Sequence, residues 1–382
     1  MMVRQRLVTY GIATTALATV ALALWLKPWS SESLTSNDKP NDKPTPVETA
    51  KHRIDVVFAV DTTGSMGGLI DGAKRTVWSI ASHIREIDQQ ADLHVGLVAY
   101  RDLGDEYITR DFPLTADLDS VFAELSSYQA AGGGDAPEDV DAALFDAVHK
   151  MQWRDGAKKM VFLVGDAPPA SRGDVPRFEV TAREASDHQI VLNTIRCGVD
   201  GETQTAWQQI ASIGHGEFST IQQDGGVQQI ATPYDAKMAE LSAKVDATTV
   251  IYGDASAHMG WEGKMHATKA AAPAAAADRA GYYAAKPSKK GEGRAREDIV
   301  GGVASGLVDV ESLTATNLPA DMREMSKDQI KTEITRRAKV RDEAQKEISE
   351  LAKQRAEYIR GHATDKDGFD AKVKATVERE LK

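Results

Sequence analysis

Residues 56–68, VVFAVDTTGSMGG, place oxygen-bearing side chains at alternate positions directly after an apolar run. Asp61, Thr63 and Ser65 offer one carboxylate and two hydroxyls, and such oxygen donors suit Mg²⁺, Mn²⁺ or Ca²⁺ better than softer metals. The glycines among and after them let the backbone turn tightly enough for the three oxygens to face one point. The same residues also fit an ordinary helix start, with a hydroxyl as the N-cap and Asp61 stabilised by the helix dipole.

Two further acidic residues stand in similar positions. Asp166 comes directly after the apolar run VFLVG, and Asp135 lies in the glycine-rich stretch AAGGGDAPED ahead of an expected helix. Each of them alone fits a cap or a turn residue. If the three loops share one edge of a parallel sheet, however, their oxygens can meet around one cation. The sequence therefore predicts a site for Mg²⁺ (or Mn²⁺ or Ca²⁺) made by Asp61, Thr63, Ser65, Asp135 and Asp166.

The segment from about 51 to 246 must position these residues, and in it apolar strands alternate with amphipathic helices. Strands are expected at 54–60, 93–100, 159–165 and 189–195, with a weaker one at 216–221. Helices are expected at 67–90, 117–128, 137–152, 178–187, 203–213 and 233–245. This order predicts an α/β fold, a doubly wound, mainly parallel sheet with helices on both faces. Ligands of such folds bind at the carboxyl ends of the strands.

The segment 54–246 resembles a von Willebrand factor type A (VWA) domain, whose metal-ion-dependent adhesion site has the pattern Asp-x-Ser-x-Ser after the first strand. Here the pattern is Asp61, Thr63 and Ser65, so a threonine replaces the first serine and keeps its hydroxyl. The family's final aspartate matches Asp166. Its middle threonine falls nearest to Asp135, which is the main departure; "VAYRD" and "GGGD-PED" are similar to a bacterial branch of the family.

The resemblance implies that the hydroxyls bind the metal directly, that the aspartates act largely through water, and that a partner's carboxylate completes the coordination. The departure at Asp135 changes this expectation. If Asp61, Asp135 and Asp166 all stay ionised beside one dication, the local charge is about −1, and an incoming acidic ligand gains less Coulomb energy. We therefore expect a retained metal site with a weaker preference for acidic ligands.

The stretch YRDLGDEY at 100–107 adds Arg101, Asp102 and Asp105 just after the second expected strand. These residues fit a solvated salt-bridge cluster, or the border of the ligand face, or a second cation site. The sequence has no HExxH motif, and no nucleophile, base and orienting group form an evident set. A non-enzymatic binding or assembly module is favoured. The alternatives are a metal-dependent hydrolase or phosphotransfer enzyme, and a VWA fold with a purely structural metal.

Composition limits the partners and the stabilising bonds. A formal charge of −11 argues against a nucleic-acid partner, which would require a basic face. The single cysteine, Cys197, excludes an intrachain disulfide and a cysteine-ligated zinc site.

The N-terminal region predicts export. Residues 7–26 carry no charge and are long enough, as a helix, to span a bilayer. We expect residues 1–29 to be a transmembrane anchor, which makes a single-pass membrane protein with a periplasmic or cell-surface domain; the alternative is a signal sequence cleaved near Ala23, and secretion. Residues 30–50 are rich in Ser, Asn, Asp, Lys and Pro, which predicts a disordered linker.

The region after the expected VWA domain, 51–246, divides into two parts. Residues 247–298 are rich in Ala, Gly, Pro and Lys, which predicts a low-complexity linker, and residues 299–382 read as a helical region. Its helix from Met325 to about Ile359 has one apolar stripe that could pack on the domain or on a second copy. A coiled coil is only weakly indicated, because Arg341 and Arg355 occupy heptad positions that favour apolar residues.

Overall fold

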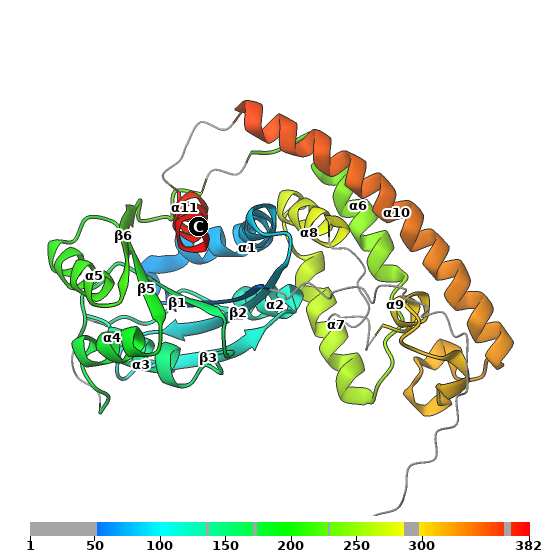
Figure 1. The fold of residues 1–382 in the computed structure, drawn as a ribbon, viewed down its shortest axis with the longest axis horizontal. Helices are drawn as coiled ribbons and strands as arrows, with labels where there is room; N and C mark the ends of the chain where they lie inside the picture. The colour runs from blue at the N-terminus through cyan, green and yellow to red at the C-terminus, as the bar shows by residue number, and fades with distance from the viewer. Residues whose placement is uncertain (1–51, 135–136, 171–173, 228–229, 286–297, 363–367) are drawn as a thin grey trace, which may run out of the picture. The chain divides into compact units, whose positions relative to one another are not determined.

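The computed structural model describes residues 52–134, 137–170, 174–227, 230–285, 298–362 and 368–382 (Figure 1). The expected anchor at 7–26, the expected linker at 30–50 and the predicted metal ligand Asp135 lie outside the described residues. Within the described ranges, no helix is both long enough and apolar enough to cross a membrane.

A six-stranded sheet with the order β3-β2-β1-β4-β5-β6 forms the centre of the α/β domain. The strands are β1 (His52–Asp61), β2 (Ala91–Tyr100), β3 (Thr109–Thr115), β4 (Lys158–Gly165), β5 (Ile190–Cys197) and β6 (His215–Ile221). All neighbouring strands are parallel except β2 and β3, which are antiparallel. The predicted mainly parallel α/β sheet is confirmed.

Strand β3 was not expected from the sequence. It lies at the edge of the sheet, only partly buried, and contains Pro113. Proline is tolerated on an edge strand because one side of that strand makes no ladder hydrogen bonds. The short, half-exposed segment therefore lacks the continuous apolar run by which the central strands were recognised.

Both faces of the sheet are buried by helices, as the uninterrupted apolar strands require. Along β1, Val56 and Phe58 contribute to the core on one face, while Val57 and Ala59 contribute to the core on the other. The first face is covered by α1 (Gly67–Ile87), α2 (Leu118–Ser127) and α11 (Phe369–Leu381). The second face is covered by α3 (Val140–His149), α4 (Phe178–Asp187) and α5 (Gly201–Ile213).

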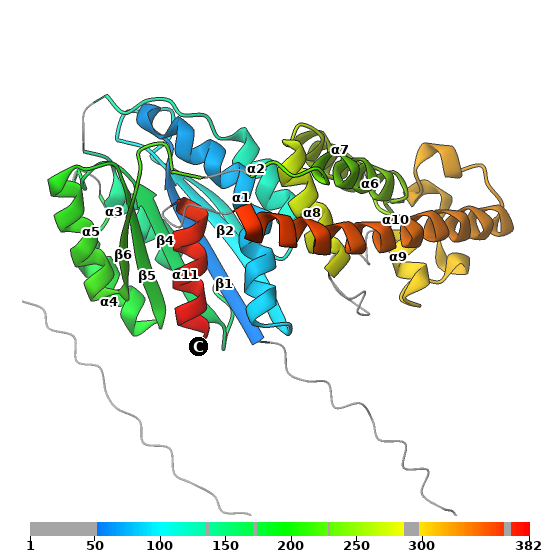
Figure 2. The same ribbon diagram turned by 90° about the horizontal axis from the view of Figure 1, so that it is seen from above.

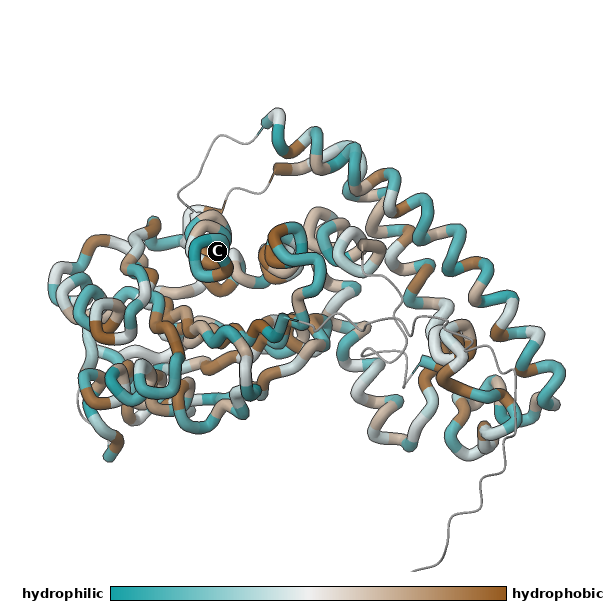
Figure 3. Tube along the Cα trace, viewed as in Figure 1, coloured by the Kyte–Doolittle hydropathy of each residue, from teal (hydrophilic) through white to brown (hydrophobic). Residues whose placement is uncertain are grey.

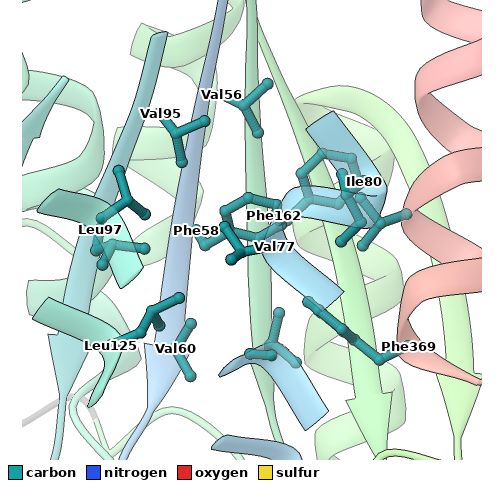
Figure 4. Packing of buried hydrophobic residues seen from close by; sticks show 14 of the residues in the cluster. Val56, Phe58, Val60, Val77, Ile80, Val95, Leu97, Leu125, Phe162 and Phe369 are labelled. Atoms are coloured by element: carbon teal, nitrogen blue, oxygen red, sulfur yellow. The ribbon is translucent and has the colours of Figure 1, made fainter. Parts of the chain in front are cut away.

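The C-terminal helix α11 belongs to the α/β domain rather than to a separate helical region. Val373 and Val377 have no exposed surface, and Phe369 packs against Phe58 of β1 with 6.1 Å between ring centroids (Figure 4). Figure 2 shows α11 beside α1 on one face of the sheet. The sequence placed residues 299–382 in one region; the structure separates their last helix, because its apolar face completes the core over β1 and β4.

The linker expected over 247–298 is wrong for residues 255–269 and 273–285, which form α7 (Ala255–Lys269) and α8 (Pro273–Ala285). Alanine has the highest helix propensity of all residues, so an alanine-rich composition also suits helices. Asp254 caps α7 by accepting a hydrogen bond from Ala257 N, and Pro273 begins α8, where its missing N–H costs nothing. The buried face of α8 includes Ala277 and Tyr282.

The long helix α10 (Lys327–His362) packs along α6 (Asp235–Ala247) and α8, and its apolar stripe is covered by this chain itself. Ile330 and Ile334 pack against the segment around α9 (Ile299–Ala304), and Ile348 packs against α6 and α8. Most of the remaining surface of α10 is hydrophilic (Figure 3).

The arginines that interrupt the heptad pattern of α10 are explained by ion pairs inside the molecule. Arg355 donates to Asp235 Oδ1 (2.7 Å) on α6 and to Asp278 Oδ1 (2.6 Å) on α8. Arg341 pairs with Asp298, which caps α9. Both the apolar stripe of α10 and these arginines therefore make their contacts within the same chain.

A candidate metal centre at the carboxyl edge of the sheet

Asp61, the last residue of β1, has no exposed surface. Its Oδ1 accepts hydrogen bonds from Thr63 N (2.8 Å) and Thr63 Oγ1 (2.7 Å). Its Oδ2 is buried and finds no hydrogen-bond partner in the part of the chain that the structure describes. Burial raises the pKa of the Asp61 carboxyl to about 7; the hydrogen bonds from Thr63 and the nearby backbone N–H of Asp166 oppose this rise, and the charge of the Asp166 carboxylate adds to it.

Asp166 lies close enough to Asp61 to influence its ionisation, because β4 pairs directly with β1 and both residues stand at the carboxyl ends of these strands. Gly165 makes this approach feasible: a Cβ there would lie 3.1 Å from Asp61 Oδ2 and 2.4 Å from the Tyr100 hydroxyl oxygen. Asp166 is half-buried, and its Oδ2 accepts a hydrogen bond of 2.5 Å from the amide of Gln223. The structure thus brings the two predicted aspartates together.

Thr63 does not act as the helix cap that the alternative interpretation required. It stands before the short 3₁₀ helix η1 (Gly64–Met66) but makes no capping hydrogen bond, and its hydroxyl donates to Asp61 instead. The N-cap position of α1 is Met66, which has no side-chain cap within the described structure. Ser65, in η1, is exposed at the site. The hydroxyls at 63 and 65 are therefore not used to start a helix.

The glycine-rich loop at 131–134 packs against this first loop. Ala131 N donates to Thr62 O (3.1 Å), and Gly64 N donates to Gly132 O (3.3 Å). Gly133 has a φ of 77°, and a Cβ on it would meet Thr63 Cβ at 3.0 Å, so both its backbone conformation and its position favour glycine. Asp135 follows this loop directly but lies outside the described residues, so its role as a ligand remains a prediction.

Glu138 is a residue of the site that the sequence interpretation missed. Only 3% of it is exposed, and its Oε2 is buried without a hydrogen-bond partner among the described residues. Burial raises its pKa to about 8, and the charges of Asp61, Asp102, Asp105 and Asp166 raise it further. Glu138 was visible in the sequence as the second acidic residue of GGGDAPED. Its burial depends on how the loop folds, which the sequence pattern does not reveal.

Backbone hydrogen bonds fix Glu138 beside the loop that follows Asp166. Glu138 N donates to Pro168 O (3.0 Å), and Ala170 N donates to Glu138 O (2.8 Å). The hydrogen bonds therefore join the segments after β4 and before α3 at the same edge of the sheet as Asp61.

Arg101 is buried, so the expected solvated salt-bridge cluster is wrong in the solvation of this residue. Only 4% of it is exposed, and its guanidinium donates to Thr62 O (3.2 Å) and Gln129 O (2.8 Å). It also lies over the ring of Tyr107, 4.3 Å from the centroid. Its Nη1 also pairs with the exposed carboxylate of Glu106 at 3.5 Å. Arg101 therefore ties three loops of the site together through backbone carbonyls and keeps one acidic neighbour as a partner.

Asp105 borders the site as well. Its Oδ2 accepts hydrogen bonds from Gly133 N (3.0 Å) and Asp102 N (3.3 Å). The loop after β2 thus contacts the glycine-rich loop, as expected for residues at the border of a ligand face.

The donor set fits a hard divalent cation. Across the described residues, no three Asp, Glu, His or Cys side chains are arranged so that they could hold a metal by themselves. A cation here requires the hydroxyls of Thr63 and Ser65 as well, and these are hard oxygen donors like the carboxylates. The buried oxygens of Asp61 and Glu138, whose ionisation is disfavoured, are groups that a nearby positive charge would stabilise.

Residues 55–233 match the family model of the von Willebrand factor type A domain, and this segment has the mainly parallel, helix-flanked sheet described above. The chain therefore contains a VWA domain. The match ends before α6, so the helices from α6 onwards, α11 included, lie outside it.

Two relatives share part of the sequence. The alpha-protein kinase vwkA of Dictyostelium discoideum is 29% identical over 121 residues, which cover 31% of this chain and 19% of that protein. The putative ariadne-like RING finger protein R811 of Acanthamoeba polyphaga mimivirus is 28% identical over 124 residues, which cover 30% of this chain and 11% of that protein. The chain thus matches less than a fifth of the length of each.

Solved structures are also similar to part of the chain. The SpRpn10 VWA domain has a TM-score of 0.36 at 11% identity and covers 47% of this chain and 92% of its own. BatB from Bacteroides thetaiotaomicron has a TM-score of 0.34 at 17% identity, covering 44% and 90%. Proximal thread matrix protein 1 from the mussel byssus, with a zinc-occupied MIDAS motif, has a TM-score of 0.31 at 17% identity, covering 45% and 42%.

Proposed function

We propose that this protein is a non-enzymatic binding module whose VWA domain holds one divalent cation at the carboxyl edge of its sheet and recognises a protein partner through it. One observation carries the proposal: the fully buried Asp61 leaves Oδ2 without a hydrogen-bond partner in the described structure. The charge of Asp166 raises the pKa of Asp61, and the charge of Asp61 raises the pKa of Glu138. A cluster of carboxylates that raise each other's pKa is stabilised by a bound cation.

The proposed ligands are the hydroxyls of Thr63 and Ser65 and the carboxylates of Asp61, Asp135 and Asp166. Glu138 adds negative charge beside them. The all-oxygen set favours Mg²⁺, with Mn²⁺ and Ca²⁺ as alternatives. When bound, the cation supplies positive charge and an open coordination position. Because the surrounding carboxylates already offset its charge, acidic ligands should bind more weakly than at a site with two carboxylates.

Isothermal titration of the protein with MgCl₂ and MnCl₂ tests the metal site. Ser65→Ala should weaken binding at least tenfold, because it removes an exposed hydroxyl ligand and leaves the buried core unchanged. Ser256→Ala, at an exposed position on α7, is the matched control and should bind like the parent protein. Equal affinity for all three proteins would exclude Ser65 as a ligand.

A structural metal and an enzymatic metal are the alternatives. Partner capture in Mg²⁺ and in chelator, with Ser65→Ala alongside, distinguishes the structural case: it predicts a lower melting temperature in chelator with unchanged capture. The enzymatic case predicts hydrolysis of a phosphoester or peptide that is lost in Asp61→Ala. It is disfavoured because the sequence offers no evident nucleophile with a general base.

We also propose that the module is tethered to a membrane by the uncharged stretch at 7–26, with the VWA domain on the extracytoplasmic side. Fractionation of cells that express the full chain, with and without residues 1–29, tests the tether. Self-association through α10 is not part of the proposal. The apolar side chains of α10 pack against this chain itself, and Arg355 forms an ion pair with Asp235 of α6.

A further inference from the structure

The loops on both sides of the candidate metal centre each carry an exposed apolar side chain. Leu103 follows β2 and is 52% exposed, and Val199 follows β5 and is 91% exposed. Between these strands lie β1 and β4, which carry Asp61 and Asp166 at their carboxyl ends. The edge of the sheet thus presents an apolar residue, the acidic centre and a second apolar residue in that order.

Each apolar residue is connected to the centre by a short chain of contacts. Leu103 lies between Asp102 and Gly104, in the loop whose Asp105 accepts a hydrogen bond from Gly133 N. On the other side, Val199 follows Gly198, which approaches Gln223 so closely that a Cβ would lie 2.3 Å from Gln223 Oε1. Gln223 in turn donates to Asp166. Both loops therefore contact residues that border the site, through Asp105 on one side and Gly198 on the other.

The spacing of these features has a counterpart in an extended peptide. Adjacent strands lie about 4.8 Å apart, so β2 and β5, three spacings apart, end about 14 Å from each other. In an extended segment, residues i, i+2 and i+4 point to one side, and i and i+4 lie about 13 Å apart. Such a segment, crossing the edge of the sheet, would bring two apolar side chains to the loops after β2 and β5, which carry Leu103 and Val199, and the middle side chain to the ends of β1 and β4.

We propose that the VWA face binds an extended protein segment with the pattern apolar-x-Asn-x-apolar, whose apolar side chains contact Leu103 and Val199. This inference rests on the proposed function, since the middle residue faces the cation. An uncharged oxygen donor suits that place because three carboxylates, those of Asp61, Glu138 and Asp166, lie at this edge of the sheet, and their charges outnumber the two positive charges of one dication. An acidic middle residue would add repulsion, and a lysine would compete with the cation.

Binding of three synthetic peptides to the full chain in MgCl₂, measured by fluorescence anisotropy, tests the inference. The first has the core Leu-Thr-Asn-Thr-Leu, the second has its last leucine moved to i+3, and the third has Asp in place of Asn. The first should bind about tenfold more tightly than the second, whose leucines cannot both point toward the protein. It should also bind more tightly than the third.

The variants Leu103→Asn and Val199→Asn should each weaken binding of the first peptide about tenfold and, because they add no charge, leave the Mg²⁺ affinity from titration unchanged. Val180→Asn, at a 43% exposed position on α4, is the matched control and should have no effect. The inference is overturned if the two rim variants bind the first peptide like the parent, if i+3 and i+4 spacings bind equally, or if none of the peptides binds to the Mg²⁺-loaded protein.

A different result would contradict the proposed metal site but not the peptide site. In that case the parent protein binds no metal, and the first peptide binds equally in MgCl₂ and in chelator. If the variants at Leu103 and Val199 still weaken peptide binding, these two residues contact the peptide and the cation takes no part in binding it.

Discussion

Gln223 holds the carboxylate of Asp166: the amide Nε2 of Gln223 lies 2.5 Å from Asp166 Oδ2. Gln223 is exposed and belongs to the loop after β6, whereas Asp166 follows β4, so the bond joins two loops across the intervening strand β5. A residue that orients a metal-site carboxylate in this way commonly changes metal affinity by tenfold or more when it is replaced.

Gln223→Leu should therefore weaken Mg²⁺ binding roughly tenfold in isothermal titration, since it keeps the side-chain size and removes the donor. Gln222→Leu, a neighbouring exposed position, is the matched control and should titrate like the parent protein. Equal affinities for the two variants would show that Asp166 needs no positioning by Gln223.

The metal-free protein should lose stability as the pH rises from about 4 to about 8. The pKa of Asp61 rises from 3.8 in the unfolded chain to about 7 in the folded protein, and that of Glu138 rises from 4.5 to about 8. In this range the folded state binds more protons than the unfolded chain, so the free energy of unfolding falls as the pH rises. Urea unfolding in chelator at several pH values measures this slope.

The variant Asp61→Asn supplies the control for the pH dependence. It removes the titrating group while it keeps an oxygen that can accept from Thr63, so the slope between pH 4 and pH 7 should flatten. Excess Mg²⁺ should raise stability most at the upper end of the range, where the carboxylates are ionised when the cation is bound. An unchanged slope in Asp61→Asn would assign the loss of stability to other groups.

The sequence predicted the parts of the fold whose signals are local. The central strands have continuous apolar runs, and Asp61 and Asp166 stand at the carboxyl ends of two of them as predicted; the structure adds that these two strands are neighbours. The partly buried edge strand β3 has no such run, and the alanine-rich helices α7 and α8 have a composition that also suits linkers. The local sequence pattern could not distinguish an edge strand from a loop, or an alanine-rich helix from a linker.

Other features depend on contacts between distant residues. The sequence predicted a helical region over 299–382, but that its last helix, α11, covers β1 follows only from the fold, where Phe369 meets Phe58. The depth of Glu138 likewise depends on how its loop pairs with residues 168–170. In both cases the residue type was visible in the sequence, and its surroundings were not.

Gly68 allows the start of α1 to touch the loop after β6. A Cβ at this position would lie 2.8 Å from Asp224 Cα, a backbone atom that cannot move aside without shifting the loop. We expect Gly68→Ala to lower the free energy of unfolding by about 1–3 kcal/mol, as overpacking usually does, and to be detected by urea titration.

Gly263→Ala provides the opposite case for the same substitution. Gly263 lies inside α7, and a Cβ there would meet no atom within 4 Å. Since alanine favours helices over glycine, this variant should gain about 0.5–1 kcal/mol. Similar effects of the two substitutions would mean that Gly68 is not under steric constraint.

Arg279 joins α8 to the α/β domain through buried charges. It is 4% exposed and donates to Asp119 Oδ2 of α2 (2.8 Å) and to Asp246 Oδ2 of α6 (2.7 Å). Arg279→Met keeps the length of the stem but takes the guanidinium charge away from two carboxylates, of which Asp119 has no exposed surface. We expect the free energy of unfolding to fall by about 3–5 kcal/mol, because breaking a buried ion pair leaves charge that water cannot solvate. Arg336→Met, which breaks an exposed pair with Glu333 on α10, should change stability little. If both variants unfold at the same urea concentration as the parent, the buried bridges do not hold α8 against α2 and α6.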